Sequence, residues 1–218
     1  EEFEIPAVGD LRRVIVSLSE TEPLVQELLN YRFKTTSDLN GHTLGNLLLT
    51  ALIEVSGNLS YGIEALGKVL NLKGKVLPVT QDNVKLVAEM MNGEVIEGEH
   101  KITQAKKQIK RVYYKEQPKV LDEVLEQIKS ADLIILSMGS LFTSIIPNLI
   151  CEDVIKAIDS SNAEIMYVCN MMTQPGETDN FTVSDHVNAL NSYLGNNKIS
   201  AVIVNNGEIS EEVINKKL

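Results

Sequence analysis

Leucine, isoleucine and valine recur every three or four residues through the first 70 positions of the chain, a spacing typical of amphipathic helices. The pattern predicts helices over residues 11–18, 24–29, 47–55 and 61–70. No stretch in this region has the alternation of apolar and polar residues that marks a strand. The first third of the chain is therefore predicted to be helical.

The pattern changes after Gly74. Short apolar runs at residues 75–79, 84–90, 94–99 and 109–115 are typical of strands. Asn92-Gly93 lies between two of these runs and predicts a two-residue hairpin. We expect residues 75–115 to form an antiparallel β insertion in the main sheet, or a flank on it.

Helices and strands then alternate to the end of the chain. Helices are predicted at residues 119–129, 152–159 and 184–194. Each is followed by a predicted strand, at residues 133–136, 164–169 and 201–204 respectively. A further helix is predicted to begin near Ser210. Such alternation predicts parallel strands joined by right-handed crossovers, the α/β class. The 218 residues are expected to form one domain.

Two polar loops follow neighbouring strands of this predicted sheet. The first, residues 137–148, contains a glycine, several hydroxyl residues and an asparagine, and the second spans residues 170–178. Because parallel strands end at one edge of a sheet, both loops should line one cleft. Backbone N–H groups at the helix start after the first loop would attract an anion. An ordinary strand-to-helix turn is the alternative for each loop.

Composition narrows the functional classes. Apolar residues make up 44% of the chain and the net charge is −10, which disfavours a general nucleic-acid binder. Cys151 and Cys169 show no metal-ligand spacing, as in a reduced cytoplasmic protein. No signal peptide is recognised, and no apolar run approaches the roughly 18 residues of a membrane span. The sequence leaves open whether the protein is a homo-oligomer.

Individual polar residues allow two interpretations. Asp10 precedes an apolar helical pattern, so it can cap that helix or hold Mg²⁺ beside a diphosphate. His42 and His186 are isolated and lack ligand spacing. No nucleophile with its base, no Walker motif and no GxGxxG pattern is found.

Five longer motifs resemble those of the YvcK/CofD-like family, in the same order and over nearly the whole chain. They are Gly9-Asp10-Leu11-Arg12, Tyr31-Arg32-Phe33, the run from Gly41 to Asn46, the run from Met138 to Leu149, and the run from Asn170 to Thr178 closed by Ser184-Asp185-His186-Val187. Gluconeogenesis factors look closest, and 2-phospho-L-lactate transferase is the archaeal relative. The resemblance implies a Rossmann-like, three-layer αβα fold that binds a UDP-sugar. It also implies a role in cell shape and in growth on gluconeogenic carbon sources.

The resemblance also implies a set of site residues. The loop at the diphosphate would supply Gly139, Ser140, Leu141, Thr143 and Ser144, and the same cleft would be lined by Asn170, Thr173, Gln174 and Glu177, with His42 and Asn46 from the earlier motif. Asp10 corresponds to a metal-side, catalytic carboxylate of the transferase. The family's N-terminal strand, Gly-rich loop and second acidic loop are missing here, so Asp10 is the one metal-side carboxylate that can be named. This favours a nucleotide-sugar-binding regulatory protein over a Mg²⁺-dependent transferase.

Overall fold

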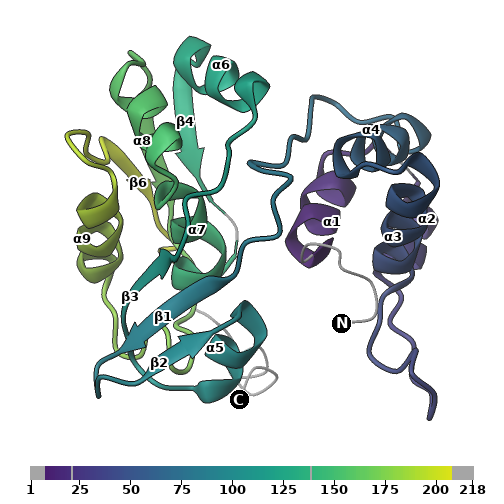
Figure 1. The fold of residues 1–218 in the computed structure, drawn as a ribbon, viewed down its shortest axis with the longest axis horizontal. Helices are drawn as coiled ribbons and strands as arrows, with labels where there is room; N and C mark the ends of the chain where they lie inside the picture. Colours follow the sequence, from purple (N-terminus) through teal and green to yellow (C-terminus); the bar gives the residue numbers. More distant parts are fainter. Residues whose placement is uncertain (1–7, 21, 138, 208–218) are drawn as a thin grey trace. The chain divides into compact units, whose positions relative to one another are not determined.

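The computed structural model describes residues 8–20, 22–137 and 139–207, with side chains from residue 11 onward (Figure 1). The chain separates into two compact units, Glu1–Lys85 with Glu116–Gln127, and Leu86–Lys115 with Ile128–Leu218. Since two such units can belong to one domain, the single domain predicted for residues 1–218 stays a prediction.

The first unit is helical, as predicted. Its helices are α1 (Val8–Ser17), α2 (Pro23–Asn30), α3 (Leu44–Ser56) and α4 (Leu59–Val69). Their apolar faces share one core, in which Ile15, Leu49, Ile63 and Leu66 are almost fully buried. The helical periodicity read from the sequence therefore corresponds to the side chains that leave water, which supplies the main stabilisation of such a unit.

Side-chain caps set the starts of two of these helices. The Thr43 side chain accepts the Asn46 N–H at the start of α3, and Asn58 accepts two N–H groups at the start of α4. A cap on the following helix was one of the two interpretations of Asp10. Its position contradicts that interpretation, because α1 already begins at Val8 and Asp10 lies within the first turn.

Residues 75–79 do not form the predicted strand. Pro78 carries no N–H, and the nearest ladder-like contact is an isolated bridge of the following residue, Thr80, with Val120. The carbonyl of Val79 accepts the Leu121 N–H at 3.0 Å, which holds residues 116–121 to the first unit. The chain then enters α6 (Asp122–Ser130).

The second unit contains an antiparallel sheet with strand order β2-β1-β3. Its strands are β1 (Leu86–Met90), β2 (Val95–Glu97) and β3 (Ile109–Tyr114), and α5 (Glu99–Ala105), which the sequence did not reveal, joins β2 to β3. The predicted hairpin exists, but its loop has three residues rather than two. Gly93 adopts φ +84° and its N–H donates to Met90, a type I turn closed by a left-handed glycine.

The second unit also contains a parallel sheet with strand order β4-β5-β6. Its strands are β4 (Leu133–Leu136), β5 (Glu164–Val168) and β6 (Ala201–Ile203). A π-helix (Leu141–Ile145), α7 (Ile146–Leu149) and α8 (Glu152–Asp159) connect the first two strands, and α9 (Val183–Tyr193) connects the last two (Figure 1). This confirms the predicted Rossmann-like α/β class, with parallel strands and an antiparallel hairpin. The two sheets are separate, and the helix predicted near Ser210 lies outside the described residues.

Gly62 sets the close approach of α3 and α4. A methyl group added there would lie 2.7 Å from Ile53 Cγ1 and 2.9 Å from its Cα. We therefore expect Gly62→Ala to lower the free energy of unfolding by about 1–3 kcal/mol through overpacking, measured by urea denaturation.

Gly67→Ala is the matched control, since Gly67 lies on the same helix and its added methyl would meet only the flexible side chain of Leu72, at 3.0 Å. It should be neutral or stabilising by up to about 1 kcal/mol, because alanine favours helix. Equal effects of the two substitutions would contradict the packing explanation.

Candidate functional site

Two loops converge at the edge of the parallel sheet, as the sequence predicted. β4 and β5 pair in parallel with Leu136 opposite Tyr167, so the loops that follow them leave the sheet side by side. The Asn170 side-chain amide donates to the carbonyl of Gly139 at 3.0 Å, and the Gln174 amide donates to Ser140 Oγ at 2.9 Å. Side chains of the second loop therefore hold the first in place.

The first loop leads into a π-helix rather than a regular α-helix. The N–H of Ile145 donates to the carbonyl of Ser140, five residues earlier, at 3.0 Å. Pro147 lies two residues after Ile145, at the start of α7. It has no N–H to donate, and its ring does not fit against a tight preceding turn, which favours the wider helix. The Asn148 side chain donates to the Ser144 carbonyl at 2.8 Å, which supplies that carbonyl with a donor.

Glu177 occupies the position where the sequence predicted an external anion. Its carboxylate is 4% exposed and accepts the Phe142 N–H at 3.1 Å and the Thr143 hydroxyl at 3.0 Å. Burial raises the pKa of Glu177, and the donated hydrogen bonds act in the opposite direction. The start of this helix is therefore already capped by an internal carboxylate, which corrects the expectation that its donors face a ligand.

A pocket of about 370 Å³ lies beside the second loop, within the second unit. Asn170 and Thr173, both predicted, line it. Sequence reasoning missed the other residues that line it, which are Cys169, Met171, Met172, Phe181, Thr182, Val183, His186, Val204, Asn205 and Gly207. The available signal was their position, since these residues lie in the loops after β5 and β6 and at the start of α9.

His186 is a buried part of this pocket's wall. Its Nδ1 lies 3.0 Å from the hydroxyl of Tyr167, and the Phe181 ring meets its imidazole edge-on. Burial lowers the pKa of His186, while Asp185 raises it by a smaller amount. The pocket therefore offers amides, hydroxyls and apolar surface rather than charge.

The other predicted site residues have different environments. Leu141 and Thr143 are buried at 0% and 6% exposure. In the first unit, His42 is exposed, and Asn46 lies in the first turn of α3 with its Oδ1 buried and unpaired. The side chain of Asp10 lies outside the described residues.

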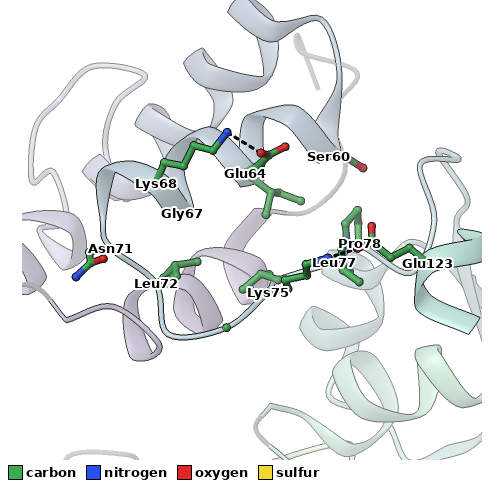
Figure 2. Close-up of a pocket in the computed structure, with 13 residues that line it drawn as sticks. Ser60, Glu64, Gly67, Lys68, Asn71, Leu72, Lys75, Leu77, Pro78 and Glu123 are labelled. Carbon is green, nitrogen blue, oxygen red and sulfur yellow. Dashed lines mark hydrogen bonds and ion pairs between the residues drawn. The ribbon is translucent and has the colours of Figure 1, made fainter. Parts of the chain in front are cut away.

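A larger pocket, of about 610 Å³, lies in the first unit between α4 and residues 71–78 (Figure 2). Its wall contains Lys68 paired with Glu64 and Lys75 paired with Glu123, each at 2.6 Å. Both ion pairs are exposed, and in each pair the glutamate neutralises the lysine. The pocket wall therefore carries no net charge from these pairs that would select a charged ligand. None of the predicted site residues lines this pocket.

No group of three or more potential metal-ligating side chains occurs among the described residues. The predicted Mg²⁺ therefore depends on Asp10 alone and stays a prediction. In the same part of the chain, no helix has the length and apolar character needed to cross a bilayer.

The fold and the paired loops define a Rossmann-like α/β protein with a candidate ligand cleft at the carboxyl edge of its parallel sheet. Comparison with protein families refines this class. The family model described as 2-phospho-L-lactate transferase CofD matches residues 1–218, and the chain belongs to this CofD family.

Named relatives agree with this assignment. The chain is 44% identical over 216 residues to the gluconeogenesis factor of Bacillus subtilis, covering 99% of this chain and 68% of the relative. It is 43% identical over 214 residues to that of Halalkalibacterium halodurans, covering 98% and 66%. A crystal structure of a Bacillus halodurans protein matches with a TM-score of 0.89 at 42% identity, covering 99% of this chain and 71% of that one. The chain thus spans about two thirds of the length of these relatives.

The hydroxyl of Thr143 stabilises the buried carboxylate of Glu177. Thr143→Val keeps the side-chain volume but removes one donor, so we expect the free energy of unfolding to fall by about 1–3 kcal/mol, measured by urea denaturation. Thr103→Val, at an exposed position of α5, should change it by less than about 0.5 kcal/mol. A Thr143 effect as small as that of the control would contradict the capping role.

The raised pKa of Glu177 makes a signed prediction about pH. The native state keeps this proton at pH values where the unfolded chain, with a pKa of about 4.5, has lost it. The stability contributed by the protonated form is therefore complete at low pH and is lost as pH rises through the native pKa. Wild type should lose stability relative to Glu177→Gln as pH rises above about 4.5, the pKa of the unfolded chain. A constant difference above this pH would show that burial does not raise this pKa.

Proposed function

We propose that this chain is the ligand-binding part of a regulatory protein that binds a nucleotide-sugar, a UDP-sugar in particular. Occupancy of the cleft would signal precursor supply during growth on gluconeogenic carbon sources and would support normal cell shape. The family membership and the names of the relatives support the gluconeogenic role. A cytoplasmic location is part of the same proposal.

The observation that carries this proposal is the convergence of two loops beside a pocket without charged side chains. Asn170, Thr173, Thr182 and Asn205 offer amides and hydroxyls, and Phe181 with two methionines offers apolar surface. Such a wall suits a base or a sugar, which bind through neutral hydrogen bonds and ring contacts. A volume of about 370 Å³ fits one of these two groups.

A transferase of the CofD type is the second candidate, favoured by the description of the family model. Transfer of a phospho-organic group from a nucleoside diphosphate needs positive charge, usually Mg²⁺, to stabilise the charge that develops on phosphate oxygens. Asp10 is the candidate carboxylate for that ion. Release of nucleotide from nucleoside diphosphate donors in the presence of Mg²⁺ would distinguish an enzyme from a binding protein.

Calorimetry tests the binding proposal directly. We expect UDP-N-acetylglucosamine to bind with a dissociation constant in the micromolar range. This corresponds to a standard free energy of binding on the order of −8 kcal/mol. Thr173→Ala removes one neutral hydrogen bond at the pocket wall, so affinity should fall about two- to tenfold.

The matched control is Thr103→Ala, which changes an exposed threonine on α5. This variant should bind UDP-N-acetylglucosamine with the affinity of the wild-type chain. Two results would count against a nucleotide-sugar in this pocket. One is the absence of binding heat with the wild-type chain, and the other is equal affinity of the Thr173→Ala variant and the wild type.

A further inference from the structure

Arg12 is a buried arginine where three helices of the first unit meet. Its side chain is only 5% exposed, and its Nη1 donates to Asn30 Oδ1 at the end of α2. A methyl group on Gly45 would lie 2.7 Å from Arg12 Cδ, so the arginine passes directly over the first turn of α3. The sequence places an obligatory cation at the start of this helix, where the backbone N–H groups already favour negative charge.

Two polar atoms beside Gly45 are buried and lack partners. Arg12 Nε is a donor without an acceptor, and Asn46 Oδ1 is an acceptor without a donor. The charges that act on Arg12 are those of Arg13 and Arg32, which together with burial, the larger cause, lower its pKa. Among the side chains that the structure describes, no carboxylate pairs with Arg12. A buried cation in this state is costly unless a counter-ion completes it.

A second arginine adjoins the same turn from the exposed side. The backbone of Arg32 forms a bridge with Thr43, the cap of α3, and its Nη1 donates to the carbonyl of Gly41. An arginine has five N–H donors, and this contact uses one donor of an exposed guanidinium. Arg12 and Arg32 therefore place two positive charges around one helix start.

We propose that Arg12, Arg32, Asn46 and the first turn of α3 bind a phosphoryl group. Its oxygens would accept hydrogen bonds from Arg12 Nε and from the Arg32 guanidinium. Arginine is well suited to such charge-assisted hydrogen bonds with phosphate. An oxygen that keeps its proton, as phosphates partly do near their second pKa of about 6, would donate to Asn46 Oδ1. The site lies within the first unit, and it does not depend on nucleotide-sugar binding by the second.

Two simpler occupants compete with this ligand. One buried water, accepting from Arg12 Nε and donating to Asn46 Oδ1, would satisfy both unpaired atoms. Carboxylates of Glu1, Glu2 and Glu4, which lie outside the described residues, are the other alternative. The experiment must therefore separate an external phosphate from both.

Calorimetric titration of the chain with inorganic phosphate and, separately, with methyl phosphate tests the site. Wild type should bind both if the site accepts esters, and inorganic phosphate alone if it takes only the free ion. Arg32→Gln, at an exposed position, should weaken binding about tenfold or more, since a charge-assisted hydrogen bond is lost. Arg12→Lys keeps the charge but loses Nε, and should weaken binding by a similar factor.

Lys101→Gln is the control, because it removes an exposed positive charge in the second unit. It should bind phosphate as wild type does. Equal weakening by all three substitutions would indicate an adventitious ion only and would overturn the site. So would wild type that does not bind phosphate, or one that binds only after Glu1, Glu2 and Glu4 are changed to Gln. Loss of UDP-sugar binding with phosphate binding retained would leave this site standing and remove the proposed function.

Discussion

The candidate cleft depends on one buried carboxylate. Glu177 accepts from the backbone of Phe142 and the hydroxyl of Thr143, and so joins the loop after β5 to the helix after β4. The parallel pairing of these strands brings the two segments together, but pairing alone does not fix the shape of the loops. A buried carboxyl group with donated hydrogen bonds is directional and costly to leave without partners, so it permits few loop arrangements.

Most of the architecture could be predicted from the sequence because periodicity reports burial directly. β4 and α8 have the predicted bounds, and the helices of the first unit follow their apolar stripes. The prediction of strands and helices failed where tertiary contacts decide which structure a segment adopts. Residues 75–79 have strand-like composition but form no strand, and only the next residue, Thr80, makes an isolated bridge. Helix α5 begins at Glu99, where the sequence suggested that a strand would end.

The candidate site was predictable in its location but not in its details. Parallel strands must end at one edge, so the convergence of the loops followed from alternation of helices and strands. Which polar group meets which could not be read from one sequence. Glu177 was expected to line the cleft, yet it faces inward and is bonded to the protein itself. The pocket wall instead includes Asn205 and His186, which come from segments that the sequence did not connect.

The π-helix that follows Ser140 has a consequence for the loop before it. Because Glu177 and Gln174 hold this turn through hydrogen bonds within the protein, its shape is formed before any ligand binds. A receptor built in this way loses little conformational entropy on association, so complementarity alone would decide which molecules are retained. Discrimination would then come from a rigid template rather than from a segment that folds around whatever enters.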